Sequence, residues 1–595
     1  MNESDQETNN GLGTFEHVVV LMLENRSFDN LLGYLYTKDQ KNFEGVDGKN
    51  LSNPIPAAYQ FKDQNGVPVT EVPVTRNTNP VDYQVPYPDP GEDYPHVNTQ
   101  LFNPDNPQPF NQPPYNLPSM VPLPTMNGFV TDYIQNYINN EFPSTPPLDQ
   151  LAPTYDQYKV IMECYDPTGV PVLSSLAQEF AVFDHWFCSV PSETICNRNF
   201  WHAGTSWGHV INPGPGDDSG DQSNGPNTDR WFEDTAGLTL FDHLSKSDWK
   251  IYSDNKIPLA EGTNLSFPIT PLLHFWAFSP LFIFEHQDIF NTLDKFKSDC
   301  ANGTLPAYSF LEPNFFNPHN DMHPSTPGET VDGPQTVGSV LLGEALVWEI
   351  YNAIFTSPNL WDNTLLIITF DEHGGCYDHV VPPGKYGENT VEPAEIATPP
   401  DLSDYIQWDG FDFSRLGIRV PMIMVSPYIK KNTIINTPLS HTSFLKTMHK
   451  KWGLLSLSTR EDASPYFHDT GLFSSTLQRA TMADMPNLAA PVVPVDNTDY
   501  SKAIMSALGK AIMALFKELW CKAFPGDCPS TEITTQEDAA AFLRDKVYKA
   551  KSKLSPNDAA LGQAAEINEH DWMLPLRAIA EELKEKNPRL ASCKK

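Results

Sequence analysis

Two apolar, β-branched runs give the clearest hydrophobic pattern in the chain. The first lies close to the N-terminus and ends at Glu24 and Asn25, and the second lies far along the chain and ends at Asp371 and Glu372. Uninterrupted apolar runs of this length are typical of strands that are buried on both faces. Open α/β sheets bind ligands beyond the carboxyl ends of such strands. If the two strands are neighbours, three carboxylates and an amide converge, and a metal cation is needed to offset their repulsion.

Strand-like and helix-like patterns alternate over about residues 17–460. We expect strands at residues 17–23, 249–252, 306–311, 365–370 and 420–425, and helices at residues 173–183, 337–355 and 441–452. Such alternation is typical of the α/β class. It predicts one domain over residues 1–475, with a central, mostly parallel sheet flanked by helices. Residues 38–125 are rich in Pro, Asn, Asp and Tyr and lack periodicity, which predicts a long irregular insertion that walls or covers a site.

The character of the chain changes after residue 475. Residues 476–500 are rich in Pro, Asn and Asp and are predicted to form a linker, and residues 501–595 are predicted to be helical. The first predicted helix carries an apolar stripe, which consists of Ile504, Leu508, Ile512, Leu515, Phe516, Leu519 and Trp520. The stripe predicts packing on the preceding domain. The alternative is an amphipathic helix that touches a lipid surface.

The composition excludes some classes of ligand and of location. The formal net charge of -36 over 595 residues argues against nucleic acid and against recruitment by anionic lipid headgroups, because both require a basic surface. No apolar stretch reaches the roughly 20 residues that span a bilayer. The N-terminus lacks the basic and apolar regions of a Sec signal, so we expect a soluble protein that is cytoplasmic or exported by a signal-less route. Among the eight cysteines, Cys521 and Cys528 are close enough in sequence to form a disulfide.

Both acid pairs lie within motifs that resemble a known family. One motif runs from Glu24 to Asp29 (ENRSFD), and the other runs from Asp371 to His379 (DEHGGCYDH). Shorter blocks follow in the same order as in the family, at residues 194–198, 311–313, 321–324, 419–427 and 441–443. The chain resembles the bacterial phosphoesterase family of phospholipases C and acid phosphatases, which belongs to the alkaline phosphatase–arylsulfatase superfamily. The resemblance covers about residues 15–450 and implies an alkaline-phosphatase-like fold and a phosphoric ester hydrolase.

The resemblance implies that the two acid pairs bind the metal. Its ligands would be Glu24, Asn25, Asp371 and Glu372. Hard oxygen ligands suit a divalent cation, and zinc also accepts carboxylates. We expect zinc first, and calcium, manganese and magnesium also fit such ligands. The structural alternative is that Glu24 and Asp371 only cap helices that follow the strands.

The resemblance also places a hydroxyl nucleophile at Thr194. The family carries this hydroxyl two residues before a Pro-Asn-Arg-like triplet, in which Cys196 here replaces the usual Pro, and Ser192 is the alternative nucleophile. Coordination to the metal would lower the pKa of the hydroxyl and aim it at phosphorus, which implies a covalent phospho-threonine intermediate. Asn197 and Arg198 follow, and we expect them to bind the phosphate at a helix N-terminus. A structural ion pair is the alternative for Arg198.

Histidines and one unusual acid complete the candidate site. His323 and His441 match family positions associated with phosphate binding, and histidine also titrates where a general acid must act. His373 follows the second acid pair and is expected to bind substrate or to orient that pair. Where many relatives carry a histidine after an Asp-Pro pair, this chain has Glu92, with His96 four residues on. Either one could enter the site, and Glu92 would add an oxygen ligand for a second metal or a cationic headgroup.

These features predict a metal-dependent phosphoesterase. We favour a phospholipase C that hydrolyses glycerophospholipids such as phosphatidylcholine to diacylglycerol and a phosphorylated headgroup. The aromatic-rich insertions would form an apolar mouth, and aromatic rings beside acids suit a choline cation. The expected partners are therefore a phospholipid or a phosphorylated small molecule and the surface of a membrane. The alternatives are a broad-specificity acid phosphatase that acts on soluble phosphomonoesters, and a non-catalytic binding module on a phosphatase fold.

Overall fold

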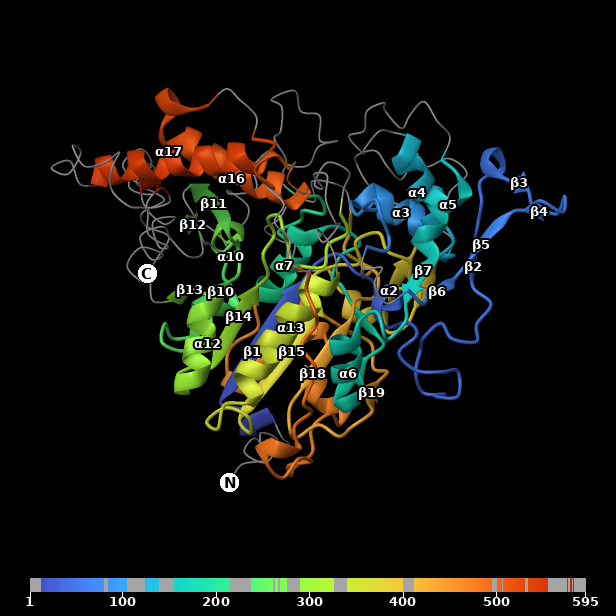
Figure 1. Ribbon diagram of the computed structural model, residues 1–595. Helices are drawn as coiled ribbons and strands as arrows, with labels where there is room; N and C mark the ends of the chain where they lie inside the picture. The colour runs from blue at the N-terminus through green and yellow to red at the C-terminus, as the bar shows by residue number, and fades with distance from the viewer. Residues whose placement is uncertain are drawn as a thin grey trace.

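An eight-stranded sheet lies at the centre of the computed structural model (Figure 1). The structure describes residues 12–79, 84–103, 123–138, 153–212, 237–260, 263–265, 268–274, 289–325, 340–399, 411–494, 500–503, 505, 507–529, 533–554, 575, 578, 579 and 582. The strand order across the sheet is β13-β10-β14-β1-β15-β18-β8-β19. In chain order, these strands are β1 (His17–Leu23), β8 (Ala181–Phe183), β10 (Trp249–Ser253), β13 (Phe290–Thr292), β14 (Tyr308–Glu312), β15 (Thr364–Phe370), β18 (Met422–Val425) and β19 (Thr433–Ile435).

Most neighbouring strands of this sheet are parallel. β1 runs parallel to β14 and β15, β10 runs parallel to β13 and β14, and β8 runs parallel to β19. β18 is antiparallel to both of its neighbours. Parallel strands need long crossover connections, which usually contain helices that cover the sheet. The predicted class, α/β with a central and mostly parallel sheet flanked by helices, is confirmed.

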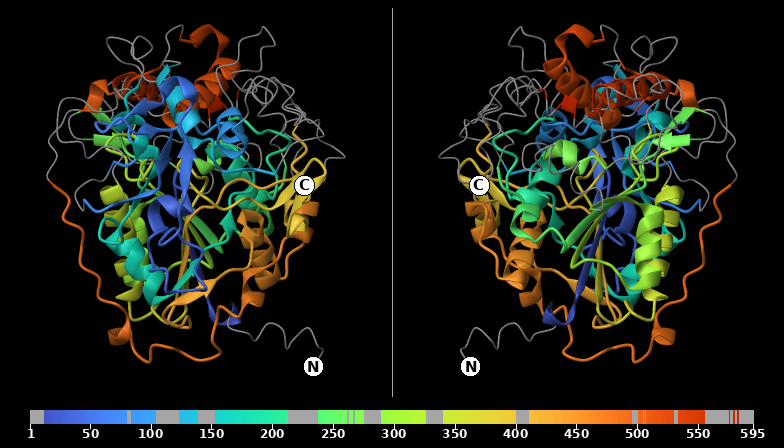
Figure 2. Two further views of the ribbon diagram at one scale, coloured as in Figure 1. Left: turned by 90° about the vertical axis from the view of Figure 1, so that its right-hand side faces the viewer. Right: turned by 90° about the vertical axis from the view of Figure 1, so that its left-hand side faces the viewer.

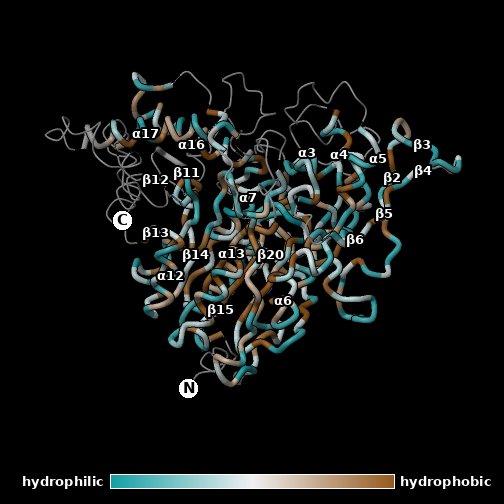
Figure 3. The backbone as a smooth tube through the Cα atoms, in the orientation of Figure 1, coloured by the Kyte–Doolittle hydropathy of each residue, from teal (hydrophilic) through white to brown (hydrophobic). Residues whose placement is uncertain are grey.

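The two apolar runs are adjacent strands in the middle of the sheet. Leu23 at the end of β1 lies beside Phe370 at the end of β15, and both strands are almost completely buried. Figure 3 shows hydrophobic residues concentrated along the central strands. The prediction that these runs are neighbouring strands is confirmed, so that the acid pairs after them start at the same edge of the sheet.

Helices cover both faces of the sheet (Figure 2). The α-helices are α2 (Phe28–Leu32), α3 (Tyr94–Phe102), α4 (Phe129–Ile138), α5 (Tyr155–Tyr158), α6 (Pro171–Glu179), α7 (Thr194–Ala203), α9 (Leu240–His243), α10 (Thr270–Leu273), α12 (Leu293–Asn302), α13 (Val340–Phe355), α14 (His441–Trp452), α15 (Thr459–Ala463), α16 (Ala507–Ala523) and α17 (Gln536–Leu554). On one face, α13 packs against α6 and α12. On the other face, α14 packs against α7, where the rings of Trp201 and Phe444 stack with their centroids 4.1 Å apart.

Two segments differ from the helices and loops that the pattern predicts. The helix expected at residues 173–183 ends at Glu179, because Ala181–Phe183 joins the sheet as β8 between β18 and β19. The insertion at residues 38–125 contains helix α3, whose first turn is capped by the side chain of Asp93, which accepts from the backbone of His96. It also contains short strands. These are β2 (Ser52–Pro54), β3 (Phe61–Lys62), β4 (Pro68–Val69), β5 (Glu71–Pro73) and β6 (Thr75–Asn77), which pairs with β7 (Glu163–Tyr165).

Further short strands form two-stranded ladders outside the main sheet. They are β9 (Trp186–Phe187) with β20 (Leu439–Ser440), β11 (Ile257–Ala260) with β12 (Thr263–Leu265), and β16 (Gly384–Tyr386) with β17 (Asn389–Val391). The β9–β20 pair lies directly before α14, so it fixes the start of that helix.

The C-terminal helices pack on the rest of the chain. In Figure 1, α16 and α17 lie on the same side as α7, which is the side of the carboxyl ends of β1 and β15. The described residues of the apolar stripe are all buried within the main hydrophobic core: Leu508, Ile512, Leu515, Phe516, Leu519 and Trp520. Ile504 lies outside the described residues. A disulfide joins Cys521 to Cys528. The stripe is therefore covered by protein and is not presented to a lipid surface, and no helix among the described residues is long and apolar enough to cross a membrane.

A buried ion-pair network ties the two long motifs together behind the sheet edge. The guanidinium of Arg419 donates to Asp29 and to Asp378, each at 2.9 Å, and all three side chains are fully buried. His379 also contacts Asp29, at 2.5 Å. Asp29, Asp378 and His379 lie close enough together to hold a metal ion. The guanidinium already satisfies both carboxylates, so we interpret this cluster as structural.

We predict that Arg419→Met destabilises the protein by about 3–5 kcal/mol, because it leaves two buried carboxylates without their cation. Urea unfolding, followed by tryptophan fluorescence, measures the free energy. The matched control is Lys431→Met, which removes an exposed cation from its ion pair with Glu179 and should cost less than about 1 kcal/mol. Equal losses in the two variants would contradict a structural role for the network.

Candidate metal centre and active site

The four predicted metal ligands lie together at the carboxyl ends of β1 and β15. Glu24, Asn25, Asp371 and Glu372 are all fully buried. The backbone N–H groups of Asn25 and Glu372 both donate to Asp371 Oδ1, at 3.2 and 2.8 Å. Asn25 has a left-handed backbone (φ 56°), which asparagine adopts more readily than most residues. The sharp turn after each strand therefore brings the four side chains to one place.

A guanidinium lies between the carboxylates of the two strands. Arg198 on α7 donates from Nε to Asp371 Oδ2 at 3.0 Å and from Nη2 to Glu24 Oε1 at 3.1 Å. This is the structural ion pair that the sequence left open as the alternative for Arg198. Its Nη1 atom is buried and has no hydrogen-bond partner. Arg198 therefore holds the two acids in place and keeps one donor for a ligand.

The centre still contains more negative charge than Arg198 neutralises. Buried oxygens of three predicted ligands have no hydrogen-bond partner: Glu24 Oε2, Asn25 Oδ1 and Glu372 Oε1. Burial, followed by the charge of Asp371, raises the pKa of both Glu24 and Glu372 well above the ordinary value. Unpartnered carboxylate and amide oxygens are suitable ligands for a divalent cation, so the residues present fit a metal.

Thr194 presents an unpartnered hydroxyl on the helix that carries Arg198. It is the first residue of α7 and fully buried, and its Oγ1 atom has no hydrogen-bond partner. It lies one helical turn before Arg198, and residues four apart share one face of a helix. The hydroxyl of Ser192, the alternative nucleophile, instead donates to the backbone oxygen of Val210. The geometry favours Thr194 because its hydroxyl is uncommitted.

Asn197 supports the loop before Thr194. Its Oδ1 atom accepts from the backbone N–H of Val190 at 3.0 Å, and its Nδ2 atom donates to the backbone oxygen of Ser192 at 2.7 Å. Both ends of the amide are thus used within the loop. The structure gives Asn197 a positioning role, whereas the sequence predicted contact with substrate.

The three candidate histidines occupy different places around the acids. His323 Nε2 lies 2.8 Å from Asn25 Nδ2. His441 Nε2 lies 2.6 Å from the backbone carbonyl oxygen of Asp371. The other ring nitrogen of His441, Nδ1, accepts a hydrogen bond from the indole N–H of Trp186 at 3.2 Å. His373 Nε2 lies 2.8 Å from the side-chain oxygen of Gln100. Two of them face predicted metal ligands: His323 lies against Asn25, and His373 Nδ1 lies 3.2 Å from Glu372 Oε2.

Burial keeps these histidines neutral at physiological pH. It lowers the pKa of His323 and of His441 to about 4, and that of His373 to about 3. Neutral rings accept or donate hydrogen bonds but carry no positive charge toward a phosphate. Because both nitrogens of His441 are already bonded, its geometry indicates that it positions Asp371.

Glu92, rather than His96, reaches the acid centre. Its Oε2 atom accepts a hydrogen bond from Asn25 Nδ2 and lies 3.6 Å from His323 Nε2. His96 instead pairs with Asp132 at 2.8 Å. Two glycines allow this close approach, since Gly374 and Gly375 both have positive φ angles and a Cβ at either position would collide with the backbone of Asn25 or of Gly91.

Glu193, which the sequence pattern did not indicate, occupies the N-cap position of α7 directly before Thr194. Its Oε1 atom accepts from the backbone N–H of Asn212 at 2.9 Å. Burial, followed by the charge of Asp93, raises its pKa to about 8. No motif marks this residue, and only its position next to Thr194 could have suggested it.

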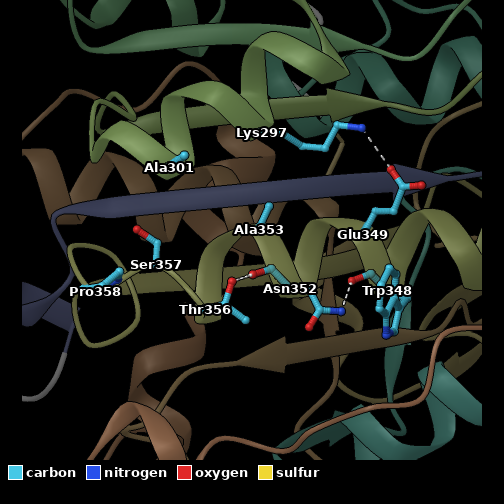
Figure 4. A pocket seen from close by; sticks show the side chains of 9 residues that line it. All are labelled: Lys297, Ala301, Trp348, Glu349, Asn352, Ala353, Thr356, Ser357 and Pro358. Carbon is cyan, nitrogen blue, oxygen red and sulfur yellow. Dashed lines mark hydrogen bonds and ion pairs between the residues drawn. The ribbon is translucent and has the colours of Figure 1, made fainter.

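A separate groove on the outer surface lacks such chemistry (Figure 4). It lies between α12 and α13 and is lined by Lys297, Ala301, Trp348, Glu349, Asn352, Ala353, Thr356, Ser357 and Pro358. Its only acid and its only base pair with each other, Lys297 Nζ lying 3.3 Å from Glu349 Oε2. The candidate chemistry therefore resides at the sheet edge.

Comparison with known proteins finds a family whose match spans the residues of this site. A model of the phosphoesterase family matches residues 15–455. Non-specific phospholipase C6 of Arabidopsis thaliana is 32% identical over 488 residues, which cover 79% of this chain and 75% of that protein. Phospholipase C B of Mycobacterium tuberculosis is 27% identical over 460 residues, which cover 74% of each chain. A solved structure of an alkaline phosphatase superfamily protein from Vibrio parahaemolyticus is 12% identical and covers 52% of this chain and 67% of its own, with a TM-score of 0.26, too low to support an argument.

The family match includes both acid pairs, helix α7 and the three histidines. It begins at the start of β1 and ends after α14, so it spans the whole central sheet. The predicted family and the predicted enzyme class are thereby confirmed. The chain belongs to the phosphoesterase family and is a phosphoric ester hydrolase.

Proposed function

We propose that the protein is a metal-dependent phospholipase C that works through a phospho-threonine intermediate. The observation that carries this proposal is the buried, unpartnered hydroxyl of Thr194, which lies one helical turn from Arg198. Arg198 in turn bonds to Glu24 and Asp371, two of the proposed metal ligands. A nucleophile, a donor for phosphate and a metal site would thus share one surface.

The proposed reaction uses these groups in two steps. The divalent ion, held by Glu24, Asn25, Asp371 and Glu372, would act as a Lewis acid on the hydroxyl and on the phosphoryl oxygens. Thr194 Oγ1 would attack phosphorus, the bond between phosphorus and the glycerol oxygen would break, and the departing glycerol oxygen would gain a proton in exchange for the one that the hydroxyl loses. Water would then cleave the phosphothreonine, releasing the phosphorylated headgroup and restoring the hydroxyl.

The protein's own donors would compensate the charge of the phosphate. The N-terminus of α7 carries a partial positive charge that favours an anion beside Thr194. Arg198 Nη1 is a charged donor without another partner. His441 would keep Asp371 in place by a hydrogen bond to the backbone oxygen of Asp371. Phosphoryl transfer depends largely on such positioning and charge stabilisation.

The relatives favour a lipid substrate over a soluble one. Proteins named phospholipase C from Arabidopsis thaliana and Mycobacterium tuberculosis align over about three quarters of this chain. We therefore propose glycerophospholipids such as phosphatidylcholine as substrates, approached at a membrane surface. The disulfide between Cys521 and Cys528 favours an oxidising compartment, and so an exported protein.

We predict that Thr194→Ala lowers kcat by at least about 10³-fold, because no other hydroxyl can replace the nucleophile. Thr194→Ser should keep measurable activity, since it retains a hydroxyl. Acid-quenched single turnovers of phosphatidylcholine, followed by peptide mass spectrometry, should find phosphocholine on Thr194. The matched control is Ser192→Ala, whose hydroxyl is bonded to the backbone, and it should retain most of the activity. Full activity in Thr194→Ala, with phosphocholine on another residue, would refute the assignment.

We predict that chelation abolishes activity and that zinc restores it better than calcium, manganese or magnesium. Asp371→Asn should lose bound metal and lower kcat by at least about 10²-fold, because it removes a carboxylate ligand. Elemental analysis of the purified protein measures the metal. Asp156→Asn, which changes an acid whose side chain is 83% exposed, is the control and should keep both metal and activity. Metal-free protein with full turnover would exclude the proposed centre.

We predict that phosphatidylcholine in mixed micelles yields phosphocholine and diacylglycerol faster than nitrophenyl phosphate yields nitrophenol at equal concentration. The physical reason is that a lipid substrate brings additional binding energy from its apolar part. Enzymatic determination of phosphocholine and chromatography of the lipids measure the products. Turnover of nitrophenyl phosphate alone would instead identify an acid phosphatase.

A further inference from the structure

A second group of potential metal ligands lies beside the proposed centre. One ligand atom from each of Asp89, Glu92 and His323 lies within 4.8 Å of the others. The side chain of His323 is 1% exposed, that of Asp89 8% and that of Glu92 11%. The group is thus nearly buried, yet it remains reachable from solvent through the two acids.

The tautomer of His323 suits a metal ligand. Its Nδ1 atom lies 2.6 Å from the backbone oxygen of Pro324, which can only accept a hydrogen bond. The proton therefore resides on Nδ1, and Nε2 carries a lone pair. A backbone carbonyl that binds the second ring nitrogen is the usual arrangement for a metal-ligating histidine. The lone pair faces Glu92 Oε2 at 3.6 Å.

The side chain of Asn25 now occupies the position that a cation would take. Its Nδ2 atom donates both to Glu92 Oε2 and to His323 Nε2. Its Oδ1 atom is buried and has no partner. A half-turn of the amide exchanges the two atoms, so the amide can direct its oxygen to one ligand set or to the other.

Acidic side chains crowd this part of the sheet edge. They include Glu24, Asp89, Glu92, Glu193, Asp371 and Glu372. Two guanidinium groups lie near them: Arg198 donates to Glu24 and Asp371, and Arg26 donates mainly to backbone oxygens such as that of Met322. A cation between Asp89 and Glu92 would offset the repulsion between neighbouring carboxylates.

We propose that Asp89, Glu92 and His323, with the amide of Asn25, bind a second divalent cation. This inference rests on the proposed function, because Asn25 belongs to both ligand sets. A mixed set of two carboxylates and one imidazole suits zinc or another transition metal better than calcium or magnesium, which prefer oxygen alone. A methylated ammonium headgroup cannot bond to an imidazole lone pair. The set of Asp89, Glu92 and His323 therefore suits a metal ion better than it suits choline. A pair of metal ions could hold both the attacking and the leaving oxygen of a phosphoryl transfer.

Metal content of the full-length protein tests this proposal directly. The protein is stripped with chelator, dialysed against zinc and then against metal-free buffer, and analysed for zinc by mass spectrometry. The wild type should retain about two zinc ions per chain and Glu92→Gln about one. Glu92→His, which restores a ligand atom, should return the content toward two. Glu193→Gln removes a neighbouring carboxylate outside both ligand sets and, as the matched control, should retain two.

The outcomes separate this inference from the proposed function. One zinc ion in the wild type, or two in Glu92→Gln, would overturn the second site while leaving the first intact. An unchanged zinc content in Asp371→Asn would instead refute the first centre. Thermal unfolding of the metal-free variants checks that each one folds. The zinc content of His323→Gln should match that of Glu92→Gln if both residues are ligands. A loss of zinc in Glu92→Gln without a matching loss in His323→Gln would also contradict the proposed ligand set.

Discussion

The parallel pairing of β1 with β15 is the constraint on which the site depends. Their register places Leu23 beside Phe370, so the acids that follow must emerge side by side. Burying like charges together is unfavourable unless cations compensate them. The chain accepts this cost at one edge of its sheet and offsets only part of it with Arg198. The remaining negative charge is what the proposed metal centre would compensate.

Two buried arginines show how a structural cluster differs from a functional one. Arg419 bonds to Asp29 and Asp378 and also donates to backbone oxygens, so the charges of that cluster are compensated within the protein. Around Arg198, by contrast, carboxylate, amide and hydroxyl atoms stay without partners although they are buried. Unsatisfied buried polar groups are rare in folded proteins because they are costly. The group of such atoms around Arg198 and Thr194 therefore indicates a place kept ready for a ligand.

The sequence predicted the parts of this protein that depend on local pattern. The uninterrupted apolar runs identified β1 and β15 as buried neighbours, and the apolar stripe of α16 is buried as the packing interpretation requires. It could not predict side-chain direction. Whether Arg198 faces substrate or the acids, and whether Glu92 or His96 enters the site, depends on contacts between residues distant in the chain. The strand β8 was missed for the same reason, since Ala181–Phe183 is a strand only because the sheet offers it two partners.

A strongly acidic protein that acts on phosphate esters needs a positive electrostatic potential at its active site, although its overall charge is negative. The net charge of -36 repels an anionic phosphate at long range. The N-terminus of α7 and the free donor of Arg198 provide positive potential only within a few ångströms of Thr194. Bound divalent ions would add most of the rest, because they are the largest local charges in any such site. A zwitterionic headgroup meets less repulsion than a free phosphate dianion, and for that reason the charge of the chain itself favours a substrate such as phosphatidylcholine over a soluble phosphomonoester.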